Sequence, residues 1–196
     1  MPPETAFTTT KVRLVQANIP QAMKWTAEGK QIALSAHAEL TSQVGFNPDV
    51  VIWPETAMPY AVGPYSPWPS QLASLIPPSA VLLTGAQRMA REGDQMQIWN
   101  SLIAIDGQGN MPSSYDKHQL VPFGEFVPLP WLTGWVYRYL NMPLAGFSSG
   151  GAVQAPMQLA GHRLAFNICY EDSFGDELRA GARQAEALVN LSNLAW

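Results

Sequence analysis

Three residues of this chain carry the side-chain types that acyl-transfer chemistry requires: a cysteine, a glutamate and a lysine. Cys169 is the only cysteine among 196 residues, and it follows an apolar run that ends at Ile168. A cysteine thiol has a pKa of about 8.5, so at neutral pH a base must remove its proton before it attacks a carbonyl carbon. The oxyanion formed by that attack needs a cation or backbone amides to stabilise it. Glu55 and Lys117 supply a base and a cation, and we therefore predict an acyl-transfer site.

The turn that carries Cys169 is predicted from the sequence around it. Residues 164–168 form a short apolar run typical of a strand, and residues 173–177 have the pattern of a helix N-terminus. A strand-to-helix turn exposes its side chains and leaves backbone amides unpaired, which suits the stabilisation of an oxyanion. A lone cysteine is more often a small buried hydrophobe than a nucleophile, so the prediction depends on the residues that accompany it.

Glu55 and Lys117 also lie beside predicted structural elements. The apolar strand 49–53 stops at Pro54, and Glu55 follows at once, beyond the carboxyl end of that strand. Lys117 lies in the stretch 115–128, which combines acids, aromatics and prolines without regular periodicity. A glutamate after a strand is often a solvated loop residue. Together with the cysteine, however, these residues supply one complete set of groups, and we expect all three to converge at the same edge of one sheet.

Composition limits the classes of protein to which the chain can belong. It is 47% hydrophobic and 13% charged, which is enough for one sizeable core. The net charge of -4 and the scattered distribution of 11 lysines and arginines argue against binding to nucleic acid or, by charge, to an anionic membrane. A single cysteine excludes an internal disulfide and a cysteine-based metal site, and we expect neither a metal nor another cofactor. No apolar run approaches the ~18 residues that a membrane span needs.

The alternation of helix and strand patterns predicts an α/β layered fold. Residues 1–10 lack periodicity and are expected to form a tail, which leaves 11–196 as one catalytic domain. Residues 131–140 are rich in aromatics and fit either a core helix or a lid that faces lipid. The other predicted elements are strands at 11–17, 80–85, 99–105 and 187–191, helices at 29–44, 66–76 and 178–182, a polar hairpin loop at 88–97 and a hairpin around Gly161.

Several motifs occur in a fixed order along the chain. Trp53-Pro54-Glu55, Tyr115-Asp116-Lys117-His118 and Ile168-Cys169-Tyr170-Glu171 resemble the Glu, Lys and Cys motifs of the carbon-nitrogen hydrolase (nitrilase) superfamily. The stretches 16–25 and 120–128 resemble one branch of it, the periplasmic catalytic domains of the apolipoprotein N-acyltransferase family. The resemblance covers nearly the whole chain, and it implies an α-β-β-α sandwich.

The resemblance also implies a role for each site residue. Glu55 would be the general base, Lys117 would stabilise the oxyanion, and Cys169 would be the nucleophile that carries the acyl group. The backbone amide of Tyr170 would be the second oxyanion donor. The supporting residues that the resemblance implies are Glu125, which orients Lys117, Glu171, an acid beside the nucleophile, and Trp25 and Tyr170, aromatics on the substrate side.

The implied activity is an N-acyltransferase that moves a fatty acyl chain from a phospholipid to the N-terminal amino group of a diacylglyceryl-cysteine lipoprotein. The resemblance places such a domain on the periplasmic face of the bacterial inner membrane, attached through flanking segments absent from this chain. The family usually continues past an Asn-Asp-x-Trp motif, whereas this chain reads Asn193-Leu194-Ala195-Trp196. We therefore expect the sandwich to be incomplete at its C-terminal end.

Three other functions are compatible with the sequence. A soluble nitrilase-type amidase would use the same three residues but would transfer the acyl group to water. A cysteine-histidine hydrolase would need a histidine as its base, although a protonated His118 beside Lys117 is disfavoured. A non-catalytic binding module would result if the rest of the sandwich were needed to form the site. The histidines available as a base are His37, His118 and His162.

Overall fold

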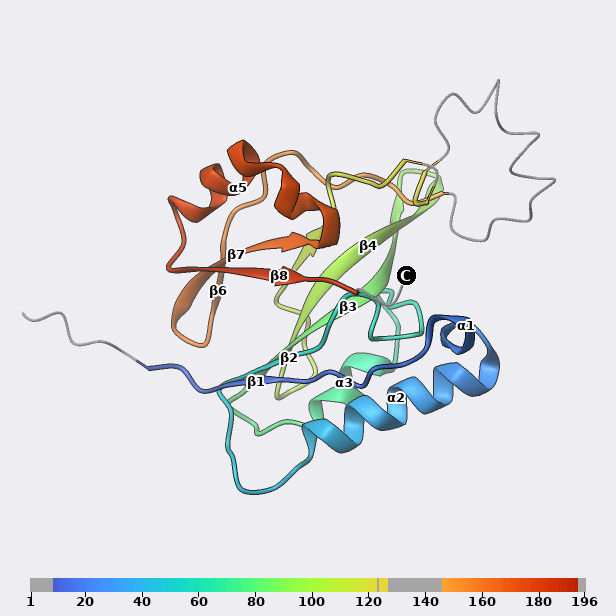
Figure 1. Ribbon diagram of the computed structural model, residues 1–196, viewed down its shortest axis with the longest axis vertical. Coiled ribbons are helices and arrows are strands. Elements are labelled where there is room, and N and C mark those ends of the chain that lie inside the picture. Colours follow the sequence, from blue (N-terminus) through green and yellow to red (C-terminus); the bar gives the residue numbers. More distant parts are fainter. Residues whose placement is uncertain (1–8, 123, 127–145, 194–196) are drawn as a thin grey trace, which may run out of the picture.

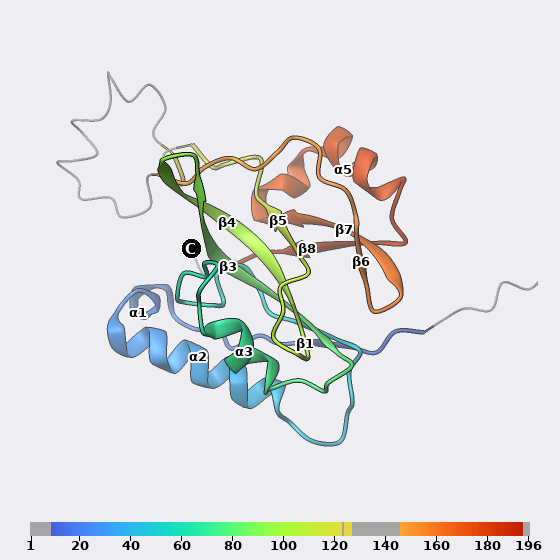
Figure 2. The same ribbon diagram turned by 180° about the vertical axis from the view of Figure 1, so that it is seen from behind.

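The computed structural model describes residues 9–122, 124–126 and 146–193. A five-stranded and a three-stranded β-sheet stack face to face, and helices lie on the outer side of each sheet (Figures 1 and 2). The α-β-β-α sandwich predicted from the sequence is therefore confirmed. No helix among the described residues is long and apolar enough to cross a membrane.

The five-stranded sheet follows the chain in its strand order. Its strands are β1 (Val12–Leu14), β2 (Val50–Ile52), β3 (Val81–Glu92), β4 (Gln95–Asp106) and β5 (Ser113–Asp116). The first three run parallel, and β4 is antiparallel to both β3 and β5. The carboxyl ends of β2 and β5 consequently lie at the same edge of the sheet. Val51, Leu82 and Ile103 are fully buried, because this sheet is covered on both faces.

Three helices cover the outer face of the five-stranded sheet (Figure 2). They are α1 (Gln21–Lys24), α2 (Ala27–Thr41) and α3 (Trp68–Ala73). Thr26 caps α2 by accepting a hydrogen bond from the Gly29 amide at 3.0 Å. The buried residues of α2 recur every four positions at Gly29, Ala33, His37 and Thr41, so one face of the helix packs on the sheet. The sequence pattern located α2 but gave no sign of α1.

The three-stranded sheet carries the cysteine turn. Its strands are β6 (Met157–Leu159), β7 (His162–Ile168) and β8 (Ala187–Leu191), in that order, and α5 (Gly175–Ala182) lies on its outer side. Ala160 and Gly161 both adopt positive φ angles, of 48° and 83°, as a two-residue hairpin turn requires. The hairpin predicted around Gly161 and the strand predicted at 187–191 are thus confirmed.

The core between the two sheets joins the elements that carry the site. Leu83, Leu102 and Ala104 of the large sheet pack with Phe166 and Ile168 of the small one. A second cluster fills the space between the large sheet and its helices. Because the two sheets share an apolar interface, the residues that follow β2, β5 and β7 are held in fixed positions relative to one another.

The prediction of a polar hairpin loop at 88–97 is wrong. β3 and β4 pair without interruption from Val81 with Asp106 to Glu92 with Gln95, and only Gly93 and Asp94 form the turn. The outer half of this long hairpin is solvated, so its residues are polar although they are fully paired. The aromatic stretch 131–140, predicted to be a core helix or a lid, lies outside the described residues.

Candidate active site

Glu55 is held by a buried frame at the end of β2. Trp53 is fully buried, and its indole Nε1 donates to the Thr41 hydroxyl on α2 at 2.8 Å. Thr56 adopts a positive φ of 50°, which is uncommon for a β-branched residue and turns the chain sharply after the glutamate. A Cβ at Gly85 of β3 would lie 2.6 Å from the Glu55 Cα. Only glycine therefore allows β3 to approach the Glu55 backbone this closely.

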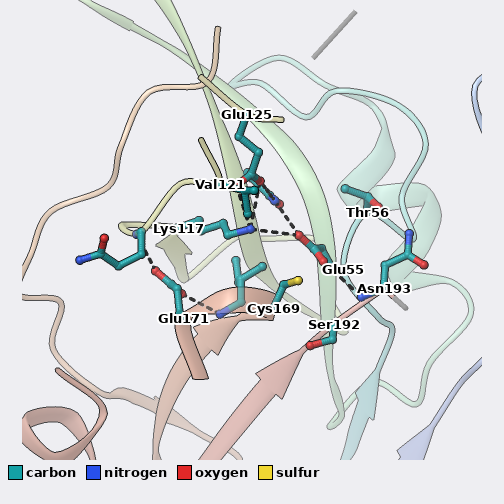
Figure 3. Close-up of polar contacts among 12 residues, drawn as sticks. Glu55, Thr56, Lys117, Val121, Glu125, Cys169, Glu171, Ser192 and Asn193 are labelled. Atoms are coloured by element: carbon teal, nitrogen blue, oxygen red, sulfur yellow. Dashed lines mark hydrogen bonds and ion pairs between the residues drawn. The ribbon is translucent and has the colours of Figure 1, made fainter. Parts of the chain in front are cut away.

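Lys117 follows β5 and is only 1% exposed. Its backbone amide donates to the Asn100 carbonyl at 2.8 Å, and its carbonyl accepts from the Gly150 amide at the same distance. The preceding residue, Asp116, forms a bidentate ion pair with Arg88, with nitrogen-oxygen distances of 2.8 and 2.6 Å. Both sides of the Lys117 backbone are therefore fixed, and its long side chain extends into the buried space near Glu55 (Figure 3).

Glu125 holds the ammonium group of Lys117. The two carboxylate oxygens of Glu125 lie 2.9 and 3.1 Å from Lys117 Nζ, and one of them also accepts from the Val121 amide at 2.9 Å (Figure 3). The backbone carbonyl of Glu125 accepts from the amides of Gly146 and Phe147, at 3.2 and 3.1 Å. The structure therefore brings Glu125 to the position that the resemblance implies, against Lys117.

Cys169 lies directly after β7, at the first residue of a short 3-10 turn, Cys169–Ser173. It adopts a positive φ of 52°, a conformation that non-glycine residues rarely adopt. The Glu55 carboxylate and the backbone amide of Tyr170 both act on the pKa of its thiol, and Cys169 is the only cysteine of the chain. The carboxylate predicted to be the base and the amide predicted to be an oxyanion donor therefore both lie near the thiol.

The prediction that the three residues meet at the edge of a single sheet is wrong. Glu55 and Lys117 follow strands of the five-stranded sheet, whereas Cys169 follows a strand of the three-stranded sheet. The site lies between the two sheets, where the carboxyl ends of β2 and β5 face the carboxyl end of β7 (Figure 3). Sequence periodicity assigns residues to strands but does not assign strands to sheets, which explains the error.

The charges of this site act in opposite directions on the cysteine and the lysine. Burial and the Glu55 carboxylate raise the pKa of the Cys169 thiol, although Lys117 and the Tyr170 amide act to lower it. Burial acts to lower the pKa of Lys117, but the carboxylates of Glu55 and Glu125 outweigh it, and that pKa is raised above 10.5. At neutral pH, therefore, the lysine is charged and the thiol keeps its proton until a base removes it.

Glu171 binds the backbone on both sides of the site. One carboxylate oxygen accepts from the amides of His118 and Gln119, at 2.7 and 3.1 Å. The other accepts from the Ile168 amide at 2.7 Å and from the Tyr115 hydroxyl at 2.9 Å. Glu171 is 3% exposed and thus ties the chain after Lys117 to the chain before Cys169. Proximity to its carboxylate, after burial, raises the pKa of Tyr115 far above its usual value.

The comparison with known proteins decides the family. The family model for carbon-nitrogen hydrolases matches residues 11–196. The chain belongs to the carbon-nitrogen hydrolase family. Solved members with the same fold include an amidase from Nesterenkonia sp., with 18% identity, a TM-score of 0.56 and coverage of 93% of this chain and 64% of that one. A Xanthomonas campestris member with an arsenic adduct in its active site has 20% identity, a TM-score of 0.60 and coverage of 95% and 66%.

The resemblance to the apolipoprotein N-acyltransferase branch is also confirmed. The chain is 43% identical over 190 residues to the apolipoprotein N-acyltransferase of Chromobacterium violaceum, covering 94% of this chain and 35% of that protein. It is 37% identical over 192 residues to the enzyme of Nitrosomonas europaea, covering 94% of this chain and 36% of that one. The chain therefore spans about a third of the length of these curated relatives.

The aromatic residues expected on the substrate side differ in their placement. Tyr170 follows the hydrolase cysteine, is 45% exposed and packs edge-to-face on Phe174, with ring centroids 5.2 Å apart. Trp25 ends α1 and is 37% exposed, and its ring lies 6.0 Å from the ammonium of Lys24. The Lys24 ammonium also donates to the hydroxyl of Thr56, the residue after Glu55, at 2.5 Å. Trp25 is therefore connected to the site through Lys24 and not by direct contact.

Two polar groups of the site could not be found from the sequence. The Asn100 side chain donates to the Glu55 carboxylate at 2.8 Å, and the backbone amide of Asn193 donates to its other oxygen at 3.1 Å.

Lys24 is 6% exposed, and its pKa is lowered by burial although the Glu55 charge acts to raise it. A cavity of about 590 Å³ is lined by Glu55, Lys24 and Asn193 but not by Cys169, so it reaches the carboxylate and not the thiol.

The histidines do not support a cysteine-histidine hydrolase. His37 Nδ1 lies 2.7 Å from the Ala33 carbonyl, and its ring packs on Trp53 in the helix-covered core. His118 Nδ1 bonds to the Gly150 carbonyl at 2.9 Å, and His162 pairs with a glutamate on the surface. The acid that acts on the pKa of the Cys169 thiol is a glutamate, Glu55.

Replacing Gly85 by alanine should displace the Glu55 backbone. The added Cβ would overlap with three backbone atoms at 2.6 Å, none of which can rotate away, so we expect the free energy of unfolding to fall by about 1–3 kcal/mol. Thermal unfolding of the full-length protein measures this loss. Gly63→Ala is the matched control, since its Cβ would lie 3.5 Å from the nearest atom, an ordinary contact. Equal stability of the two variants would contradict the tight approach at Gly85.

Proposed function

We propose that this chain carries the catalytic residues of an N-acyltransferase that moves a fatty acyl chain from a phospholipid to the amino terminus of a diacylglyceryl-cysteine lipoprotein. The observation that carries the proposal is the meeting of three residues: the Lys117 ammonium lies 3.5 Å from a Glu55 oxygen, and both groups act on the thiol of Cys169. The named relatives, which are apolipoprotein N-acyltransferases, support the choice of substrates. By the same argument, the domain works at the periplasmic face of the bacterial inner membrane.

The reaction proceeds in two halves through a thioester. Glu55 removes the thiol proton of Cys169, and the thiolate attacks the ester carbonyl of the phospholipid. The Lys117 ammonium and the Tyr170 amide stabilise the oxyanion of the tetrahedral intermediate. When that intermediate collapses, the ester bond breaks, and Glu55 returns the proton to the oxygen of the departing lysophospholipid. The acyl group then remains on the sulfur.

The second half regenerates the thiol. The neutral amino terminus of the lipoprotein attacks the thioester carbonyl, and Glu55 takes a proton from the attacking nitrogen. The carbon-sulfur bond breaks, the amide is released, and the proton on Glu55 passes to the Cys169 sulfur. One covalent intermediate thus lets a single site handle two bulky substrates in turn. Glu125 holds Lys117, Glu171 supports the cysteine turn, and Trp25 and Tyr170 lie on the substrate side.

The thioester can be trapped. Full-length protein incubated with phospholipid and no acceptor should accumulate one acyl group, which mass spectrometry places on Cys169 and neutral hydroxylamine removes. Cys169→Ala should form no adduct, whereas Cys169→Ser should form at most an ester that resists neutral hydroxylamine. Addition of a diacylglyceryl peptide with a free amino terminus should convert the adduct into an amide.

Two results would overturn this proposal in different ways. Fatty acid released to water at the same rate with and without the acceptor peptide would identify a hydrolase of the amidase type. Amide product formed in single turnover without an adduct on Cys169 would remove the thioester from the mechanism. A peptide whose amino terminus is already acetylated is the control, because it offers the same lipid anchor but no nucleophile.

A further inference from the structure

Asn100 lies in the middle of β4 and binds both acids of the site. Its side-chain amide nitrogen donates to a Glu55 oxygen at 2.8 Å and to a Glu125 oxygen at 2.7 Å. Its backbone carbonyl also accepts from the Lys117 amide at 2.8 Å. Asn100 is 3% exposed and is therefore a fixed, buried link between three charged residues of the site.

The charge balance of the site explains why such a link is needed. One buried ammonium, Lys117 Nζ, lies 2.9 Å from a Glu125 oxygen and 3.5 Å from a Glu55 oxygen. Two carboxylates that share a buried site repel each other, and one of them normally takes up a proton. Hydrogen bonds to the ionised form oppose that protonation. The side-chain amide of an asparagine can donate one such hydrogen bond to each acid without adding a charge.

The orientation of the Asn100 amide follows from its partners. Both neighbours of the nitrogen are carboxylate oxygens, so the flipped amide would place its carbonyl oxygen against two acceptors. Within the described part of the chain, no donor reaches the side-chain oxygen of Asn100, Oδ1, although that atom is buried. The residue thus leaves one acceptor unpaired while its nitrogen serves two carboxylates, which points to the nitrogen as the part that matters.

We propose that Asn100 is a positioning residue whose two hydrogen bonds hold the carboxylates of Glu55 and Glu125 at a fixed spacing around Lys117. This inference rests on the proposed role of Glu55 as the base, and it does not depend on which acyl donor the enzyme uses. Among the residues that the structure describes, the other charged or titratable groups that act on this site are Lys24 on α1, Lys117 after β5 and Cys169 after β7.

A pair of variants tests the proposal through the pH dependence of thioester formation. Asn100→Leu removes both donors at similar volume, and Asn100→Ser keeps a single hydroxyl donor that can serve only one acid. In Asn100→Leu we expect the acidic limb of the rate profile to move to higher pH by about one unit or more, because ionisation of the acids loses its hydrogen bonds. Asn100→Ser should move it by less. The rate at neutral pH should fall about 100-fold in Asn100→Leu.

A second measurement needs no substrate. In Asn100→Leu the two acids lose a hydrogen-bond donor, so their pKa in the folded protein should rise relative to the unfolded chain. A carboxyl with a raised folded-state pKa favours folding at low pH, and this contribution is lost as pH rises. The loss in thermal midpoint relative to wild type should therefore be larger at pH 8 than at pH 5. Thr84→Val is the control, since Thr84 is fully buried on the paired strand β3 and bonds only weakly, at 3.4 Å, to the Gly85 carbonyl.

The outcomes separate this inference from the proposed function. A loss in midpoint that is equal at both pH values, with an unmoved acidic limb, would overturn the positioning role and leave Asn100 a packing residue. A wild-type rate and midpoint in Asn100→Leu would overturn it as well. If the wild-type protein forms no acyl adduct, the proposed function fails, while a pH-dependent loss in midpoint still supports the role of Asn100.

Discussion

Replacing Lys117 by methionine should abolish turnover while leaving the volume of the side chain nearly unchanged. Lys117 is 1% exposed and its ammonium lies between two carboxylates, so it acts in a site from which water is excluded. Loss of one oxyanion donor from such a site costs about 100-fold to 1,000-fold in rate. Single-turnover formation of the Cys169 adduct in the full-length protein measures the effect. A variant that keeps more than about a tenth of the wild-type rate would remove Lys117 from the mechanism.

The pH dependence supplies a control on the charge of this lysine. The pKa of Lys117 is raised in the folded protein, so its charge contributes fully to stability below the usual pKa of lysine and is lost only as pH rises through the raised value. Lys117 therefore stays charged at lower pH. If the rate falls with rising pH in that range, the fall must come from the titration of another group. Lys11→Met, at an exposed position on the N-terminal side of β1, changes the net charge equally and should leave both rate and profile unchanged.

Replacing Glu55 by glutamine should separate the reactivity of the thiol from turnover. The Glu55 charge raises the pKa of the Cys169 thiol, so its removal should lower that pKa, with Lys117 and the Tyr170 amide still acting in the same downward direction. Alkylation of Cys169 by iodoacetamide, followed by mass spectrometry across a pH series, should show a midpoint at lower pH than in the wild type. Acyl transfer should nevertheless fall by about 100-fold or more, because the base is lost.

This pair of opposite changes is hard to obtain in any other way. A variant that merely loosens the site would expose the thiol and impair turnover, but it would do so with a loss of thermal stability. Glu39→Gln, on the exposed face of α2, controls for the change in net charge. An alkylation midpoint that stays in place, or one that moves to higher pH, would show that Glu55 does not act on the thiol.

The sequence predicted two of the reactive groups because each of them is a residue of distinctive chemistry that follows an apolar run. Glu55 follows the run that forms β2, and Cys169 follows the run that forms β7. The order of the motifs then predicted the family, and the structure bears out the layered fold. The roles of Glu55, Lys117 and Cys169 remain proposals, since their placement is shown by the geometry and their chemistry awaits the experiments above.

The parts that the sequence did not predict are those that depend on which strands are neighbours. Asn100 carries no reactive group and lies inside a strand, so only the pairing of β4 with β5 reveals that it meets Lys117. The same holds for Asn193, which approaches Glu55 across 138 positions of sequence. Local pattern gave no sign that the hairpin 81–106 would be paired along its whole length, because solvated strands and polar loops have similar compositions.

The backbone of Glu125 is also held from a distant part of the sequence. Its carbonyl accepts from the amides of Gly146 and Phe147, at 3.2 and 3.1 Å, while its carboxylate contacts the Lys117 ammonium. The segment that begins at Gly146 therefore acts on the buried charge of the site through the backbone of a single acid. A substitution in that segment can displace the ammonium of Lys117 without contacting it.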